Sequence, residues 1–489
     1  MESYKYKFKE TYLNQVIDKL PSRCLLNKGI TGCGGTTVEL ESKRDSIILC
    51  PTRNLVTSKS SLGYFGVDGK VTKKDIKSYL NNNNNSYKKI VATYDALPKL
   101  MDSIPNYEDY FLLIDEYHLL FNDYSFRGEC IKFILHNFKK FKDWCFMTAT
   151  PLKEEFILEE LKDIPQVTYE WENSTPVNIH IEDTYYVQKS LLKYIEEFKD
   201  KNLHIFLNSI STIYNITKNI DESLYRVVCS ESSKTKITNF SKVTSPVKKL
   251  NFYTSCAFEG CDIYDPNGLC IIICDTQIAT TVLDIATKIR QVCGRLRDSK
   301  YKNECYLILN TSKHRYANTS KKEFEFQVAE SERLGRIKHN NLHNTELTED
   351  EKNIELKLFS KEKYATLYLN KYQNDIYFDE NLKKMDIYNY NLISEIYSTS
   401  ISVIGEFEKF NTQVKTKPKI ENVPSWILEH LTKNEYTYNE LESIFTPIFE
   451  QHGLKWNKKT SIKYNFPPFT KKQKVKNHIK SLYYIFNIF

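Results

Sequence analysis

The chain has 489 residues, a net charge of +7 at pH 7 and 41% hydrophobic residues, enough apolar content for about three globular domains of ordinary size. Its longest apolar runs, such as 268–274, are far too short to cross a bilayer, so no membrane contact is expected. The twelve cysteines form no C-x-x-C pair and no N-terminal signal segment is visible. We therefore expect a soluble protein of the reducing cytoplasm, without a disulfide framework or a zinc site.

Two series of short apolar runs alternate with helix-length segments, a pattern typical of buried parallel strands in α/β domains. The first series is 24–27, 46–50, 90–94, 111–116 and 145–150, and the second is 204–208, 226–230, 250–255, 269–275 and 304–310. The interval 151–183, which contains Pro165 and Pro176, is interpreted as a linker. The predicted fold class is α/β, with parallel-sheet domains at 1–172 and 173–320 and a mostly helical C-terminal domain at 321–489.

A glycine-rich loop follows the first apolar run. Four of the chain's fourteen glycines fall within seven residues of Gly-Ile-Thr-Gly-Cys-Gly-Gly-Thr: Gly29, Gly32, Gly34 and Gly35. Such clustering indicates positive φ or close approach of the backbone to another group. The spacing matches the phosphate-binding P-loop G-x-x-x-x-G-K-[ST], except that Gly35 stands at the lysine position. The sequence leaves open a glycine-rich turn without ligand, and also whether Lys28, just before the loop, or another lysine substitutes.

Two adjacent carboxylates, Asp115 and Glu116, end the apolar run at 111–114 and are followed by Tyr117 and His118. Carboxylates at the end of a buried strand are costly unless something uses them. In a P-loop domain the first of such a pair holds Mg²⁺ and the second accepts a proton from the attacking water. The alternative is a solvated turn at a strand end.

The second series carries its own polar residues. Its run at 250–255 leads into Cys-Ala-Phe-Glu-Gly-Cys-Asp, which ends at Asp262, and a later helix carries Gln291, Arg295 and Arg297 in the pattern Gln-x-x-Gly-Arg-x-Arg. Guanidinium groups have the reach and the fixed donor geometry that suit a γ-phosphate. The alternative is a basic helix end with ordinary ion pairs.

The order of these motifs resembles the superfamily 2 helicases and translocases: a P-loop, Pro-Thr-Arg at 51–53, Asp-Glu-x-His, Thr-Ala-Thr at 148–150, Gly-x-Asp and Gln-x-x-Gly-Arg-x-Arg. The resemblance covers about residues 20–300, and the Asp-Glu-Tyr-His and Gly-Arg-Leu-Arg motifs are most similar to herpesvirus-type origin-binding helicases and related phage helicases. It implies two tandem RecA-like domains that use ATP and Mg²⁺ to translocate on, or unwind, nucleic acid. DNA rather than RNA, a place in replication or DNA processing beside replication proteins, and the host cytoplasm for a phage protein are further expectations.

The resemblance also implies roles for the matching positions. The nucleotide would lie among Gly29, Gly32, Cys33, Gly34, Gly35, Thr36, Thr37 and Asp262. Mg²⁺ would be held by Thr36 and Asp115. The catalytic set would be Glu116 as the base, Asp115, Gln291 to place the water, and the fingers Arg295 and Arg297. Coupling of nucleotide state to domain motion would fall to His118, Thr148 and Thr150. The nucleic-acid backbone would lie along Pro51, Thr52, Arg53, Thr93, Asn208 and Ser209.

Gly35 stands where this family has a lysine. Removal of such a charge-stabilising donor typically costs about 10²–10³ in rate. The alternative function is therefore a nucleotide-responsive clamp or pseudo-helicase that binds nucleic acid with little or no hydrolysis. The retained acids, glutamine and arginines favour the enzyme. A nuclease–helicase fusion is disfavoured, because no carboxylate and lysine group has nuclease spacing.

The last segment, 451–489, contains nine lysines and no acidic residue, with aromatic residues between the lysines. Phosphate neutralisation combined with base stacking is typical of single-strand binding. The expected nucleic-acid contacts are Lys455, Lys458, Lys459, Lys471 and Lys472. A winged-helix-like module at 423–489 is a further hypothesis, and a solvated basic tail with its aromatic residues in a local core is the alternative.

Overall fold

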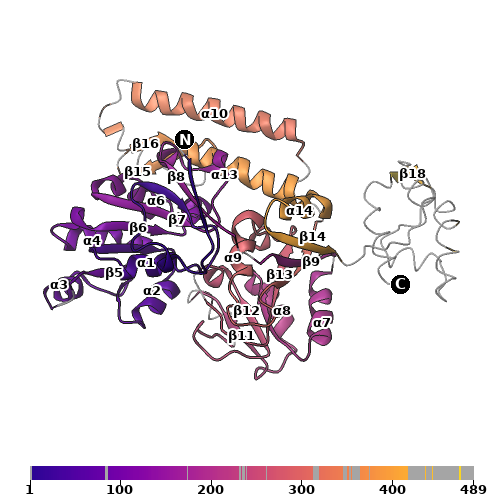
Figure 1. The fold of residues 1–489 in the computed structure, drawn as a ribbon. Helices are drawn as coiled ribbons and strands as arrows, with labels where there is room; N and C mark the ends of the chain where they lie inside the picture. Colours follow the sequence, from indigo (N-terminus) through magenta and orange to yellow (C-terminus); the bar gives the residue numbers. More distant parts are fainter. Residues whose placement is uncertain are drawn as a thin grey trace.

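A computed structural model shows two α/β lobes side by side, with later helices packed along one side of both (Figure 1). It describes residues 3–82, 86–172, 175–184, 186–230, 239–259, 262–311, 319–344, 364–373 and 375–416, together with a few isolated positions. Among the described residues, none of the helices combines the length and the apolar character that crossing a membrane requires.

The first lobe is built on an eight-stranded sheet in which every pair of neighbours is parallel. In spatial order its strands are β1 (Ser3–Phe8), β8 (Gln166–Trp171), β2 (Cys24–Asn27), β7 (Asp143–Thr148), β6 (Phe111–Asp115), β3 (Ser46–Cys50), β5 (Lys89–Thr93) and β4 (Phe65–Val67). Along β3, Ile47 and Leu49 enter one core while Ile48 and Cys50 enter the core on the opposite face. Both faces are thus covered, as the continuous apolar runs predict.

The second lobe is built on a seven-stranded sheet that is parallel throughout. In spatial order its strands are β11 (Tyr225–Val228), β12 (Leu250–Tyr253), β10 (Asn202–Phe206), β13 (Gly268–Asp275), β14 (Glu304–Asn310), β9 (Val177–Asp183) and β17 (Thr412–Thr416). Alternate residues of β13 again enter two separate cores, with Ile271 on one face and Ile272 on the other. The predicted fold class, two tandem RecA-like parallel-sheet domains with further helices, is confirmed.

Helices return the chain between the parallel strands, which need crossover connections. In the first lobe they are α1 (Gly35–Glu41), α2 (Arg53–Ser60), α3 (Lys73–Asn82), α4 (Leu97–Ser103), α5 (His118–Asn122) and α6 (Tyr124–Asn137). In the second lobe they are α7 (Val187–Glu197), α8 (Ile210–Thr217) and α9 (Arg290–Cys293). The later helices are α10 (Lys321–Asn344), α13 (Glu380–Tyr390) and α14 (Ser400–Phe407).

The segment 364–416 contacts both lobes in succession. Its first part holds the hairpin β15 (Leu369–Tyr372) and β16 (Asp375–Phe378) and is tied to α6, where the Tyr124 hydroxyl donates to Oδ2 of Asp379 at 2.8 Å. Its second part packs Val403 and Phe407 of α14 into a core of the second lobe and adds β17 to that sheet. Part of the region after residue 320 therefore belongs structurally to the two lobes.

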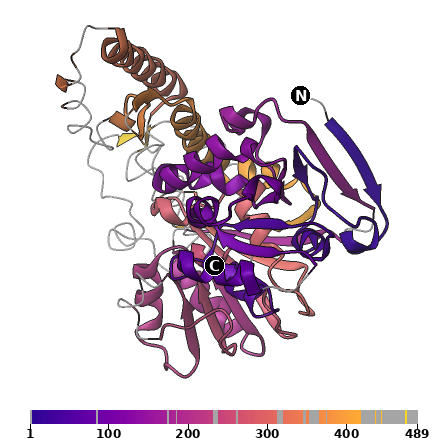
Figure 2. The ribbon, with the colours of Figure 1, turned by 90° about the vertical axis from the view of Figure 1, so that its left-hand side faces the viewer.

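The predicted linker at 151–183 is wrong in extent. It contains β8 in the first sheet and β9 in the second, so the connection between the sheets is confined to 172–176. Both strands alternate buried and partly exposed residues, unlike the continuous apolar strands of the interior. Figure 2 shows β1 lying beside β8 at the edge of the first sheet.

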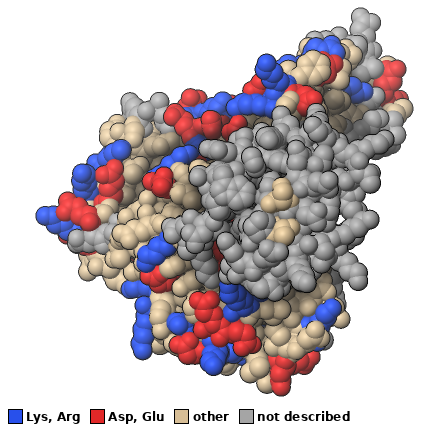
Figure 3. Space-filling view, turned by 90° about the vertical axis from the view of Figure 1, so that its right-hand side faces the viewer, with Lys and Arg blue, Asp and Glu red and all other residues tan. Residues whose placement is uncertain are grey.

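Much of the predicted C-terminal module lies outside the described residues. In 423–489 the structure describes the paired strands β18 (Glu435–Tyr436) and β19 (Gln473–Lys474) and two isolated positions. The predicted contacts that fall outside are Lys455, Lys458, Lys459, Lys471 and Lys472. On the described surface in Figure 3, basic and acidic side chains are intermixed, so charge alone marks no nucleic-acid path on the described part of this face.

Candidate nucleotide site between the lobes

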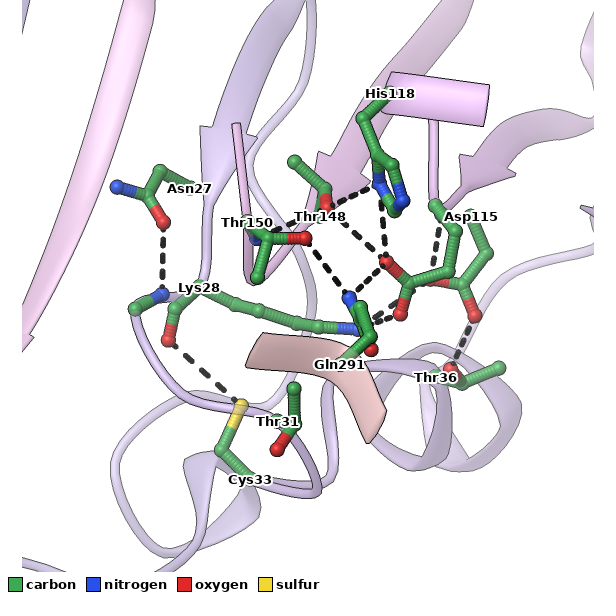
Figure 4. Close-up of polar contacts among 12 residues, drawn as sticks. Asn27, Lys28, Thr31, Cys33, Thr36, Asp115, His118, Thr148, Thr150 and Gln291 are labelled. Carbon is green, nitrogen blue, oxygen red and sulfur yellow. Dashed lines mark hydrogen bonds and ion pairs between the residues drawn. The ribbon is translucent and has the colours of Figure 1, made fainter. Parts of the chain in front are cut away.

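The predicted motifs converge at the carboxyl edge of the first sheet, where it faces the second lobe. Strands β2, β7 and β6 are neighbours in that order, so the residues that follow them lie side by side. The loop after β2, the acid pair at the end of β6 and the Thr-Ala-Thr motif at the end of β7 therefore meet (Figure 4). Ligands of open parallel sheets bind at this edge.

The glycine-rich loop 29–34 leads into α1, which begins at Gly35. Gly32 and Gly34 have φ of +76° and +86°, a region that residues with a side chain disfavour. A Cβ atom at Gly32 would lie 2.1 Å from Nη1 of Arg297, so only a bare backbone lets this second-lobe guanidinium approach. The other predicted nucleotide residues of this stretch are buried or half-buried: Cys33, Thr36 and Thr37.

The two carboxylates have different surroundings. Asp115 accepts a hydrogen bond from Oγ1 of Thr36 at 2.8 Å, and the two groups therefore present oxygen atoms side by side. Glu116 has φ of +54°, which is strained for a residue with a side chain. The Tyr94 hydroxyl donates to the backbone carbonyls of Asp115 at 2.5 Å and of Glu116 at 3.2 Å and so supports this turn. Strain of this kind, held by a buried partner, is typical of functional sites.

Lys28 is the residue of this site that the loop motif alone does not identify. Its Nζ lies 3.1 Å from Oε1 of Glu116 and 3.5 Å from Oδ1 of Asp115, and the residue is only 6% exposed. Burial alone would lower the pKa of Lys28, but the carboxylates of Asp115 and Glu116 outweigh it and hold the pKa above its usual value. A charged ammonium therefore stands beside the acid pair.

The backbone of Lys28 is fixed from two sides. Its N–H donates to the carbonyl of Thr148 at 2.8 Å, and its carbonyl accepts from Nε1 of Trp171 at 2.8 Å. Strands β7 and β8, which flank β2 on its two sides, thus hold the start of the loop. Gly29 continues this anchoring, because its N–H donates to Oδ1 of Asn27 at 3.0 Å.

Gln291 of the second lobe contacts the acid pair and the Thr-Ala-Thr motif of the first lobe. Its Nε2 donates to Oε2 of Glu116 at 2.8 Å and to Oγ1 of Thr150 at 3.1 Å. The Arg295 side chain fixes it by donating from Nη2 to Oε1 of Gln291 at 2.5 Å and from Nε to its backbone carbonyl at 2.8 Å. The proposed base is therefore hydrogen-bonded across the interface between the lobes.

The two candidate arginine fingers occupy different places. Arg295 is buried and orients Gln291. Arg297 donates from Nε to Oδ1 of Asp262 at 2.6 Å and approaches the carbonyl of Thr31 in the loop with Nη1 at 3.4 Å. Asp262 thus positions Arg297 against the loop in this structure.

His118 links the acid pair to the Thr-Ala-Thr motif. Oγ1 of Thr148 donates to Oε2 of Glu116 at 3.0 Å, and Nδ1 of His118 contacts the same Oγ1 at 2.9 Å. Because the Thr148 hydroxyl donates its proton to Glu116, the imidazole is the donor in this contact. Burial lowers the pKa of His118 to about 3, so the ring is neutral at physiological pH. Thr150 completes the chain by donating its N–H to Oγ1 of Thr148 at 3.1 Å.

The donor set suits Mg²⁺. The ion prefers oxygen ligands, keeps several waters and binds through one or two carboxylates together with phosphates. The hydroxyl of Thr36 and the carboxylate of Asp115, which are in direct contact, are ligands of that kind. A bound Mg²⁺ would neutralise phosphate charge at this position.

The predicted nucleic-acid residues lie at the carboxyl ends of β3, β5 and β10. Thr52 and Ser209 cap α2 and α8 with their hydroxyls. Asn208 accepts from the N–H of Ser255 at 3.1 Å and donates to the carbonyl of Thr280 at 2.9 Å. The others range from buried to exposed: Pro51, Thr93 and Arg53. Their contact with nucleic acid stays a prediction.

Further contacts between the lobes lie beyond the predicted motifs. Nδ2 of Asn54, next to the Pro-Thr-Arg motif, donates to the carbonyl of Cys256 at 3.2 Å. A Cβ atom at Gly294 would lie 1.9 Å from Oγ1 of Thr31, so the glycine in Gln-x-x-Gly-Arg-x-Arg permits close packing on the loop. The sequence signal for this close contact is Gly294, because the other residues at this helix end have larger side chains.

No protein-family model matches the chain, and a search of curated proteins finds no match. Among solved structures, the chain is similar to S. cerevisiae Dbp5 bound to RNA and ADP BeF3, at 11% identity and a TM-score of 0.42, over 59% of this chain and 79% of that one. It is also similar to the type ISP restriction-modification enzyme LlaBIII bound to DNA, at 13% identity and 0.40, over 59% of this chain but only 26% of that one. The yeast DEAD-box splicing factor Prp28 is matched at 18% identity and 0.24, over 68% and 80%. At these TM-scores the similarities carry no conclusion about the activity or the substrate of this chain.

Proposed function

We propose that the chain is an ATP-dependent nucleic-acid motor, a helicase or translocase of superfamily 2 type that acts on DNA. The triphosphate would lie along the loop 29–35, with Mg²⁺ held by Thr36 and Asp115. Glu116 would accept the proton of the attacking water, which Gln291 would orient, and Arg297 would approach the phosphates from the second lobe.

One observation carries this proposal. The Glu116 carboxylate contacts three groups at once: Lys28, which precedes the loop, Thr148 of its own lobe and Gln291 of the other lobe. A buried acid shared by two lobes is costly for stability alone. It is suited to a reaction whose progress must open or close the lobes, because the base and the residue that orients the water then assemble only on closure.

The second candidate function is a nucleotide-responsive clamp with negligible hydrolysis. Gly35 is the observation that favours it, because the loop lacks its own lysine. The two candidates share the nucleotide site and differ in turnover.

A steady-state ATPase assay separates them. We expect Mg²⁺-dependent phosphate release that single-stranded DNA stimulates more than single-stranded RNA of the same length does. The Glu116→Gln protein serves as the background control. Tight ATP binding with release no faster than this control would establish the clamp, and equal stimulation by RNA would overturn the DNA preference.

A further inference from the structure

We propose that Lys28 takes the place of the missing loop lysine and binds the β- and γ-phosphates of the nucleotide from the strand side of the loop. This inference rests on the proposed nucleotide site and deepens it, because it assigns the phosphate-binding charge to a residue that precedes the loop. The ordinary P-loop lysine would instead come from the first turn of α1, where Gly35 stands.

Residue 35 has little room for a side chain. A Cβ atom at Gly35 would lie 2.6 Å from Sδ of Met147, 3.2 Å from its Cε and 3.4 Å from Cδ of Lys28. The stem of Lys28 therefore passes within contact distance of the point from which a side chain of residue 35 would start. Figure 4 shows the extended Lys28 side chain, which ends beside the acid pair. Met147 therefore obstructs any side chain at residue 35, and a lysine there would start in van der Waals contact with the stem of Lys28. Lys28, which precedes the loop, reaches the acid pair without meeting this obstruction.

The Lys28 ammonium is placed to meet the charge of a triphosphate. Lys28 ends beside Asp115, which is hydrogen-bonded to Thr36, and beside Glu116. These are the residues that would hold Mg²⁺ and activate the water, so the ammonium lies where triphosphate charge would arrive. An ammonium in such a dry pocket acts on a phosphate far more strongly than it would in water.

The Lys28 ammonium also has hydrogen-bonding capacity to spare. Lys89, another buried lysine of this lobe, has its Nζ within 3.1 Å of four oxygens: Glu39 O, Ser42 Oγ, Arg44 O and Ser46 Oγ. Among the described residues, Nζ of Lys28 contacts only the two carboxylates, at 3.1 and 3.5 Å. Lys89 is a saturated structural lysine, whereas Lys28 retains donor capacity for an anion.

A consequence follows for the base. Oε2 of Glu116 accepts from Thr148 and Gln291, while Oε1 faces Lys28. When the Lys28 ammonium turns to the phosphates, Oε1 is released and can accept the proton from water. Lys28 thus pairs with the acids when no nucleotide is bound and releases the base only when a triphosphate is present.

The test compares affinities for ATP, ADP and AMP, measured by competition with a fluorescent ATP analogue at fixed Mg²⁺. Lys28→Met should weaken ATP binding about 10- to 100-fold, as expected when a charge-assisted hydrogen bond is removed, and should leave AMP binding within about twofold. Lys89→Met is the matched control: it removes a buried lysine of the same lobe and should lower the melting temperature without changing the ATP-to-AMP ratio.

A second comparison reduces the effect of leaving an acid unpaired. In Glu116→Gln the nearer of the two carboxylates is already neutral and only Asp115, at 3.5 Å, remains charged beside Lys28. The further change Lys28→Met therefore reports chiefly the interaction with phosphate, and ATP affinity should again fall at least about tenfold. An unchanged ATP-to-AMP ratio in either Lys28 variant would overturn the inference while the proposed function stands. Absence of ATP binding by the unaltered protein would overturn both.

Discussion

Restoring the motif lysine by Gly35→Lys should lower the free energy of unfolding and should not improve ATP binding. In an ordinary P-loop that lacks its lysine, the change would restore phosphate binding. Here the new Cβ atom would meet Sδ of Met147 at 2.6 Å. Met147 is fully buried in the core of the first lobe, so its thioether must be displaced within packed side chains. The new ammonium would also face that of Lys28.

The size of the effect follows from two opposed contributions. Overpacking a core typically costs about 1–3 kcal/mol. Replacing glycine in a helix can return up to about 1 kcal/mol, and less at the first residue of α1. The net change for Gly35→Ala should therefore be a loss of roughly 1–2 kcal/mol in the free energy of unfolding, and Gly35→Lys should lose more because of the added like charge.

Urea denaturation and ATP titration measure the two consequences. Gly35→Ala in a Met147→Ala background should cost less than in the parent, since the obstructing thioether is gone. Gly34→Ala is the contrasting control: a Cβ there meets no atom within 4 Å, and its cost would come from the backbone alone, at φ of +86°. An increase in ATP affinity or turnover for Gly35→Lys would refute the argument, because it would show that the loop has room for its own lysine.

Three further predictions test other parts of the molecule. Glu116→Gln should keep ATP binding and reduce phosphate release more than about 10²-fold; turnover like that of the parent would exclude Glu116 as the base. Burial raises the pKa of Glu259 to about 7 from its ordinary value of 4.5, so the folded chain holds this proton more tightly than the unfolded chain. As the pH rises from about 4.5 to 7, the free energy of unfolding should therefore fall, by up to about 3 kcal/mol. Glu259→Gln should reduce this pH dependence of the free energy of unfolding, measured by urea denaturation at several pH values. The same pH dependence in the variant and the parent would contradict the prediction. Removal of 451–489 should weaken nucleic-acid binding and leave ATP binding intact. The slope of log affinity against log salt concentration should become shallower by about 0.7 for each phosphate group that is no longer neutralised. An unchanged slope in a truncated protein that remains folded would place the nucleic-acid contacts on the two lobes.

Strands buried on both faces can be predicted from the sequence almost to the residue. The runs 24–27, 46–50 and 304–310 coincide with β2, β3 and β14. The apolar pattern does not predict β1, β8, β9 and β17, and each of these strands presents exposed or half-buried positions along its length. Strands of this kind lack the continuous apolar run, and their place is set by the neighbour with which they pair.

The sequence predicts which residue types form the candidate site, but it does not predict which of their side chains contact each other. Glycine spacing, the acid pair and Gln-x-x-Gly-Arg-x-Arg are local patterns that the chain carries in order. The separation of Arg295, which holds Gln291, from Arg297, which lies against the loop, depends on the direction of each side chain across the interface. Lys28 is visible in the sequence as a neighbour of the loop, but its contact with two carboxylates about ninety residues later in sequence depends on β2 and β6 flanking β7.

If the proposed nucleotide site is correct, the contacts of Glu116 would couple nucleotide binding to the closure of the lobes. In this structure the hydrogen bond from Gln291 to Glu116 joins the lobes, and the Lys28 ammonium lies 3.1 Å from the same carboxylate. Any group that draws Lys28 away removes that charge and leaves Glu116 to the hydrogen bonds of Gln291 and Thr148. Hydrogen bonds to an ionised acceptor contribute about 1.5–3 kcal/mol each, which is the range needed to shift a two-state equilibrium more than tenfold. A nucleotide that recruits Lys28 would therefore change how strongly the lobes hold together, without any separate relay between the site and the interface.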